Sequence, residues 1–279
     1  EVNVHNMVSI IKAYEAATVL LGEHPIENGK TMGLSAYGRD IEYFPLFING
    51  SPMVNYFSAM DGLHDESFTC FRGYEHMNGR MEKDNWLLYA DKAKHVQLET
   101  QKESLRLIEK YVNKTGIKNV CVVGGYGLNV VANNYYIKNL PDVNFYFEPV
   151  ADDSGITIGA SMLKYREETK DDKVYTLDNN FYHYYDRCEV NGDTKSIQDI
   201  VDLLKDQKVV AIFEGSPEAG PRALGHRSLL FDPRNKNGKD IMNSIKNREW
   251  YRPFAGVILE EHFSEWFETL GLERSEYMT

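Results

Sequence analysis

The stretch NVCVVGGYGLN, which covers residues 119–129, gives the clearest indication of the fold. Its first five residues are mostly apolar and β-branched, and a short apolar run of this kind is typical of a buried strand. Gly124 and Gly125 then end the strand, and residues 128–138 have the composition of a helix. A strand that turns through glycines into a helix is typical of α/β proteins.

The same alternation continues on both sides of this stretch. Residues 85–113 predict a long polar helix, because apolar side chains recur at helical spacing and Gly116 ends the pattern. Pro141 ends the helix that follows the paired glycines. A further strand at 143–147 and a helix at 156–168 complete this part of the chain.

Nearer the ends of the chain the pattern is broken by loops. Residues 8–22 predict a helix, and the glycine-punctuated run 28–38 predicts a loop. Charged residues without apolar periodicity at 167–179 indicate a surface linker. A second cycle of helix, strand, Gly/Pro/Arg-rich loop and helix then follows, with its regular elements at 196–204, 209–213 and 240–248. We therefore predict an α/β chain with a boundary near residues 170–190.

Length, charge and composition restrict the class of protein. The chain has 279 residues, with 42% hydrophobic and 26% charged side chains, which is enough for one large domain or two modest ones. Its net charge of −11 argues against a general nucleic-acid-binding protein but permits a local pocket for a small anion.

Targeting features and cysteines lead to an expected location. No apolar run approaches the roughly 18 residues of a membrane span, and no signal peptide is visible. The 3 cysteines show no metal-binding or redox spacing. We therefore expect a cytoplasmic protein with small-molecule partners and no nucleic-acid or membrane partner. Homo-oligomer formation is left open by the sequence.

The glycine turn at Gly124–Gly125 and the acidic turn at Asp152–Gly155 each have two interpretations. Backbone N–H groups at Gly124 and Gly125 suit close approach to a nucleotide, but the local pattern alone favours a tight turn with Asn129 as a local hydrogen-bonding residue. Asp153, in the run Asp152–Gly155, suits a metal ion, although an aspartate at a helix start more often caps the helix. Gly155 leaves room for a ligand or for a neighbouring backbone.

Basic residues gather near the C terminus of this acidic chain. The run GPRALGHRS at residues 220–228 carries Arg222 and Arg227, and Lys246 and Arg252 follow. Guanidinium groups donate paired hydrogen bonds to phosphates and carboxylates, so these residues indicate an anion pocket. The alternative is a set of solvated side chains. Lys30 has the same two readings, as a phosphate ligand or a solvated lysine.

Taken in order, these segments resemble the motifs of O-carbamoyltransferases of the nodulation-factor, cephamycin and aminoglycoside type. The family has a Gly-Lys-x-Met-Gly-Leu-x-x-Tyr-Gly segment, a Gly-Gly-x-x-Leu-Asn turn, a Pro-x-x-x-Asp-x-Gly segment, a Gly-Pro-Arg-Ala-Leu-Gly-x-Arg-Ser loop and an Arg-x-x-x-Arg-Pro-Phe-Ala ending. The matching segments are Gly29–Gly38, Gly124–Asn129, Pro149–Gly155, Gly220–Ser228 and Arg248–Ala255. Similarity is weak only between about Arg39 and Asn113.

The resemblance implies a two-part enzyme. Residues 1–168 would belong to an actin/Hsp70-like nucleotide-binding domain, 169–190 to a linker, and 191–279 to a YrdC-like domain. The YrdC-like part would make carbamoyl adenylate from ATP and carbamoyl phosphate. The first part would then pass the carbamoyl group to an acceptor hydroxyl of a small molecule or sugar.

The resemblance also implies roles for the candidate residues. Arg222, Arg227, Lys246 and Arg252 would be catalytic and hold carbamoyl phosphate. Lys30, Gly124, Gly125, Asn129 and Gly155 would lie at the nucleotide, and Asp153 would bind a divalent metal. Iron is the metal that the resemblance favours, and magnesium, manganese and zinc suit the same aspartate.

One segment of the family has no counterpart here. The family's His-His-x-x-His metal segment lies upstream of the Gly-Lys run, and nothing in these 279 residues matches it. The start without Met and the ending at Thr279 also lead us to expect a piece of a longer enzyme. Two alternatives stay open, namely a sugar-kinase-like phosphotransferase and a noncatalytic nucleotide-binding module.

Overall fold

The computed structural model describes residues 7–41, 45–52, 81, 84–171, 173, 192–272, 275 and 277–278. The chain divides into two compact units, and each is described by itself. Unit 1 comprises residues 1–121 with 129–146, and unit 2 comprises 122–128 with 147–279. No helix within the described ranges is long and apolar enough to cross a membrane.

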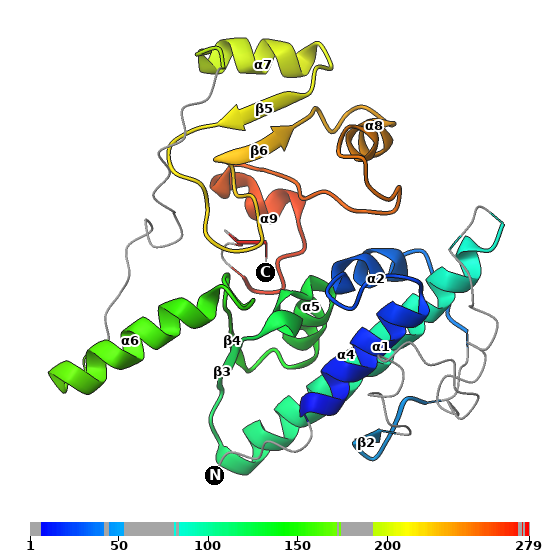
Figure 1. Cartoon of the computed structure of the whole chain (residues 1–279), viewed down its shortest axis with the longest axis vertical. Coiled ribbons are helices and arrows are strands. Elements are labelled where there is room, and N and C mark those ends of the chain that lie inside the picture. The colour runs from blue at the N-terminus through cyan, green and yellow to red at the C-terminus, as the bar shows by residue number, and fades with distance from the viewer. Residues whose placement is uncertain are drawn as a thin grey trace. The chain divides into compact units, whose positions relative to one another are not determined.

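Three helices form the core of unit 1. Helices α1 (Met7–Leu20), α2 (Asn28–Ser35) and α4 (Trp86–Thr115) pack side by side (Figure 1). Small alanines on α1 and α4 are fully buried where the helices meet, so the two backbones approach closely. These alanines are Ala13, Ala16, Ala17, Ala90 and Ala93.

Helix α2 shows that the loop predicted at 28–38 is wrong over residues 28–35. Glycine lowers helix propensity by about 1 kcal/mol relative to alanine, which is why the sequence favours a loop. Tertiary contacts override that preference, because the buried Thr31 hydroxyl lies 2.8 Å from the Thr18 hydroxyl of α1. Just beyond the helix, a Cβ atom on Gly38 would overlap the carbonyl oxygen of Ala90 in α4.

The long helix predicted at 85–113 is confirmed as α4. Gly116 ends it with φ of +71°, and its N–H donates to the Val112 carbonyl at 2.8 Å. Only glycine adopts this left-handed conformation without strain, so the helix stops where the pattern predicts. Unit 1 also contains a short antiparallel pair, β1 (Phe47–Ile48) and β2 (Ser51–Pro52).

The strand–turn–helix–strand order predicted around residue 124 is confirmed. It runs through β3 (Asn119–Val122), the short helix η2 (Gly125–Leu128), α5 (Val130–Asn139) and β4 (Asn144–Phe147). Hydrogen bonds join residues whose numbers rise together along both strands, so β3 and β4 are parallel. The prediction of a buried strand is wrong, since β3 alternates between exposed and half-buried residues. In the described part of the chain this sheet has two strands, which leaves β3 at an edge.

Unit 2 contains the second cycle of elements. Its helices are α6 (Gly155–Thr169), α7 (Ile197–Lys205), α8 (Gly238–Ile245), η4 (Glu260–His262) and α9 (Phe263–Trp266). Strands β5 (Val210–Phe213) and β6 (Arg227–Leu230) form an antiparallel ribbon that α7 contacts (Figure 1). The described residues therefore have mixed α/β character.

Two details of unit 2 differ from the sequence prediction. Arg227 and Ser228, assigned to the loop, lie in strand β6. Helix α6 forms as predicted but buries none of its residues, and Ile156 and Leu163 are exposed. Of the predicted linker at 169–190, residues 172 and 174–190 lie outside the described residues.

Candidate anion-binding site

The site in unit 2 is built around the loop that connects β5 to β6. Gly220 adopts φ of +92°, and a Cβ atom there would lie 3.3 Å from the Pro149 carbonyl oxygen and 3.4 Å from a Val150 methyl group. The loop therefore packs directly on the backbone of the Pro149–Gly155 segment. A residue larger than glycine would strain the backbone and push the loop away.

Arg222 links this loop to the glycine turn. Its Nη2 donates to the Leu128 carbonyl at 3.0 Å, across 94 positions of sequence. Its Nε is buried and has no hydrogen-bond partner among the described residues. Burial and then repulsion from Arg252 lower the pKa of Arg222. A partly buried guanidinium beside a second cation is typical of a group that binds an anion.

Arg252 lies on the segment that follows α8. Among the described residues, its guanidinium forms one ion pair, a long one with Glu249 at 3.7 Å. The buried Asn243 side chain fixes the backbone here, because its Nδ2 donates to the carbonyls of Trp250 at 3.0 Å and of Arg252 at 3.1 Å. Asn243 Oδ1 also accepts from Nε of Arg248 at 2.6 Å. Arg252 is therefore held at its backbone, and within the described residues its guanidinium is paired only at long range.

Arg248 is committed to its own segment. Its guanidinium lies 4.3 Å from the centre of the Phe254 ring, and its Nη2 donates to the Pro253 carbonyl at 3.1 Å. Burial, and then repulsion from Arg252, lower the pKa of Arg248. Arg252 therefore repels two neighbouring guanidinium groups, which concentrates positive charge at this point of an acidic chain.

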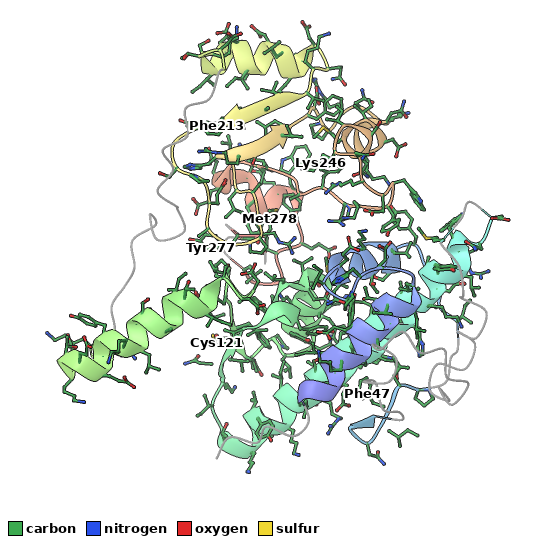
Figure 2. All side chains as sticks on the ribbon, viewed as in Figure 1. Phe47, Cys121, Phe213, Lys246, Tyr277 and Met278 are labelled. Carbon is green, nitrogen blue, oxygen red and sulfur yellow. The ribbon has the colours of Figure 1, made fainter. Side chains whose placement is uncertain are left out.

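Arg227, predicted to hold carbamoyl phosphate with Arg222, contacts the protein through its guanidinium, and its role at the phosphate stays a prediction. Its Nη1 and Nη2 donate to the carbonyls of Glu214 and Gly215, each at 2.9 Å, and its guanidinium lies 3.4 Å from the centre of the Phe213 ring. Lys246 is exposed where α8 ends (Figure 2). The structure thus brings Arg222 and Arg252 together and ties Arg227 to the β5–β6 connection.

The glycines predicted at the nucleotide differ in their surroundings. A Cβ atom on Gly124 or Gly125 would meet no atom within 4 Å, so the turn has open space beside it. A Cβ atom on Gly155 would overlap the carbonyl oxygen of Val150. The structure therefore explains Gly155 by close approach to backbone, and the glycine turn is the one with room for another group.

Asn129 and Lys30 both lie in unit 1 and have protein partners. Asn129 caps α5, and its amide exchanges hydrogen bonds with the Gln97 amide at 3.0 and 3.1 Å. The Tyr14 hydroxyl donates to the same Gln97 at 2.8 Å, and burial raises the pKa of Tyr14 far above its usual value. Lys30 pairs with Glu23 and Glu27, each at 2.8 Å. Their roles at a nucleotide stay predictions.

The two neighbouring aspartates of the run Asp152–Gly155 differ in their surroundings. The Asp152 carboxylate accepts from the N–H of Ser154 at 3.1 Å and from its hydroxyl, which organises the start of α6. Asp153 is exposed. No cluster of three or more metal-ligating side chains exists within the described ranges, so Asp153 would contribute a single ligand.

Sequence reasoning missed Glu218 and Asn243. The Glu218 carboxylate accepts backbone hydrogen bonds inside the loop, and Asn243 fixes the Arg252 segment. Glu218 had a visible signal, since it is the one acidic residue between positions 216 and 228. Asn243 had none, because an amide in a polar helix is usually solvated.

Comparison with known proteins identifies the family. Residues 1–162 match the family described as Carbamoyltransferase N-terminus, and residues 201–279 match Carbamoyltransferase C-terminus. Relatives include nodulation protein NolNO of Sinorhizobium fredii, 27% identical over 89% of this chain and 38% of its own length. Nodulation protein U of Bradyrhizobium diazoefficiens is 32% identical over 62% of the chain and 31% of its own length.

The matched region is only part of each relative. An uncharacterized protein of Synechocystis sp. is 31% identical over 64% of this chain but 32% of its own length. The chain thus spans 31% to 38% of the length of these three relatives. Because the N-terminal family match alone covers more than half of the 279 residues, the chain belongs to the carbamoyltransferase family.

Proposed function

We propose that this chain acts in ATP-dependent O-carbamoyl transfer and that unit 2 binds carbamoyl phosphate. The observation that carries the proposal is Arg222, whose buried Nε has no hydrogen-bond partner in the described part of the chain and whose charge is repelled by Arg252. A bound phosphate would pair with both guanidinium groups and relieve the repulsion. Lys246, exposed where α8 ends, would extend the same charge.

The chemistry is an exchange of activated groups. Water cleaves carbamoyl phosphate to carbamate and inorganic phosphate. A carbamate oxygen then bonds to the α-phosphorus of ATP as the α–β phosphoanhydride bond breaks, which gives carbamoyl adenylate and pyrophosphate. The carbonyl–oxygen bond of the adenylate then breaks as the acceptor hydroxyl forms a new carbon–oxygen bond, and AMP leaves. Water must be excluded from the adenylate, because hydrolysis would compete with transfer.

In this proposal the candidate cations have two kinds of role: some bind the phosphate, and others stabilise the loop. Arg222 and Arg252 contact the phosphate and stabilise negative charge that develops on its oxygens. Arg227 acts on the loop through the Glu214 and Gly215 carbonyls. The open space beside Gly124 and Gly125 would admit the nucleotide.

A divalent metal remains part of the expectation from the family resemblance, with Asp153 as one ligand. The described residues do not fit a complete metal site, because they contain no cluster of three or more suitable side chains. Metal sites of this kind need several oxygen or nitrogen ligands. We assign no catalytic step to a metal.

We further propose that residues 1–168 belong to an actin/Hsp70-like domain and residues 191–279 to a YrdC-like domain. The strand–turn–helix–strand order of residues 119–147 and the two family matches, to residues 1–162 and 201–279, support this division. We propose that the acceptor is a hydroxyl group of a small molecule or sugar, as the resemblance implies.

The test uses the 279-residue chain alongside the product of the whole coding sequence. Each is incubated with ATP, carbamoyl phosphate and a divalent metal, and products are separated by mass. We expect pyrophosphate, inorganic phosphate and carbamoyl adenylate, and we expect the Arg222→Met variant to form less of all three. Transfer of the γ-phosphate of ATP to an alcohol would instead support a sugar-kinase-like enzyme and overturn the proposal.

A further inference from the structure

Glu218 closes the loop that carries Arg222. Its Oε1 accepts the backbone N–H of Leu224 at 2.8 Å and that of His226 at 2.7 Å. The N–H of Gly225, between them, donates to the Ser228 hydroxyl at 3.0 Å. Three successive backbone donors are thus held by side chains, and Arg222 lies inside the ring that Glu218 closes.

The loop needs such a device because its backbone is otherwise loosely determined. Gly220 and Gly225 both have positive φ, at +92° and +118°, and glycine has more conformational freedom than any other residue. Hydrogen bonds to a charged acceptor are stronger than those between neutral groups. The carboxylate therefore closes the loop between Glu218 and His226, and Arg222 lies within that loop.

The Glu218 carboxylate stays ionised at neutral pH. Partial burial raises its pKa, but backbone hydrogen bonds, including those from His226 and Leu224, outweigh burial and hold the pKa below its usual value. Within the described residues the Glu218 carboxylate accepts hydrogen bonds from backbone N–H groups and forms no ion pair with an arginine. Its charge organises the loop without neutralising Arg222.

We propose that Glu218 is a positioning residue for anion binding by Arg222, an inference that rests on the proposed function. The direction in which anion affinity changes when Glu218 is replaced distinguishes a positioning role from a purely electrostatic effect of its charge. Removing a negative charge near a cationic site strengthens anion binding, because the Coulomb repulsion between that charge and the anion is lost. Removing a positioning residue weakens binding, because the loop must be ordered when the anion arrives.

The experiment measures binding of inorganic phosphate to the full 279-residue chain by calorimetry. The variants are Glu218→Gln, Glu218→Ala and Arg222→Met, and Glu214→Gln is the matched control, since Glu214 is exposed in the same loop. We expect phosphate affinity to fall about 10- to 100-fold in Glu218→Ala and less in Glu218→Gln, which keeps one acceptor oxygen. Glu214→Gln keeps the wild-type affinity or exceeds it.

Hydrogen exchange of the peptide that covers residues 220–228 provides a readout that is independent of binding. It should rise in both Glu218 variants and stay at the wild-type level in Glu214→Gln. Unchanged or tighter phosphate binding by Glu218→Gln, with binding lost in Arg222→Met, overturns the role of Glu218 and leaves the proposed function standing. No phosphate binding by the wild-type chain overturns both. If Glu218→Ala does not fold, Glu218→Gln decides the question.

Discussion

The Gly155→Ala substitution is expected to destabilise unit 2. The added Cβ atom would overlap the carbonyl oxygen of Val150 and lie 3.3 Å from its carbonyl carbon. Both obstructing atoms belong to the backbone, so no side chain can rotate out of the way. Relief requires movement of the Val150 backbone, on which Gly220 also packs.

The magnitude follows from the size of that overlap. The backbone must shift by roughly an ångström, and overpacking of this kind costs about 1–3 kcal/mol. Gly159→Ala is the matched control, because Gly159 lies one turn further along α6 and a Cβ there would meet nothing within 4 Å. In an exposed helix interior, alanine is more stable than glycine by about 0.5–1 kcal/mol. The two variants should therefore change stability in opposite directions.

Urea unfolding of both variants, followed by circular dichroism, measures the difference in free energy. Hydrogen exchange of residues 220–228 should rise in Gly155→Ala and not in Gly159→Ala, because Gly220 packs on Val150. The reasoning fails if Gly155→Ala unfolds within about 0.5 kcal/mol of the wild type. In that case a selective loss of ATP binding would favour the ligand role predicted for Gly155 from the sequence.

Three other predictions concern single side chains. Tyr14→Phe should lower the free energy of unfolding of unit 1 by about 1 kcal/mol in urea titration, because the hydroxyl donates to Gln97 at 2.8 Å within the core. Arg227→Met should lower thermal stability by several degrees in a calorimetric scan, since hydrogen bonds to two carbonyls and the contact with Phe213 are lost. The hydrogen bond from Arg234, the largest cause, lowers the pKa of Asp232 to about 2, below its value of about 3.9 in an unfolded chain. Its contribution to stability is present above pH 4 and lost as pH falls toward 2, and Arg234→Ala should flatten that part of an acid-unfolding curve.

Local chemistry explains which elements could be predicted from the sequence. The end of α4 depends on the left-handed conformation of Gly116, which its neighbours in sequence dictate. The start of α7 depends on a capping box between Ser196 and Asp199, three residues apart. In both cases the interactions that set the helix boundary lie within the segment that the pattern describes.

The elements that were predicted wrongly depend on distant partners. The helix at residues 28–35 exists because Thr31 meets Thr18 and because α4 covers it, and a window of sequence contains neither contact. The same limit applies to the cations. Composition indicates an anion pocket, but nothing local reveals that Arg227 is bound to carbonyls of the preceding strand end while Arg222 reaches Leu128.

The charge distribution of unit 2 connects its stability with its proposed ligand. Arg252 repels both Arg222 and Arg248, so holding the three together without an anion costs free energy. These segments are held in place despite the repulsion, because Asn243 donates to the Arg252 carbonyl and the Glu218 carboxylate accepts from the His226 N–H. An anion bound between the guanidinium groups would reduce their mutual repulsion, and this reduction would add to its binding free energy. Because the anion would bind the folded unit, it would also stabilise that unit against unfolding. The repulsion that weakens the fold is therefore also a source of affinity for a phosphate.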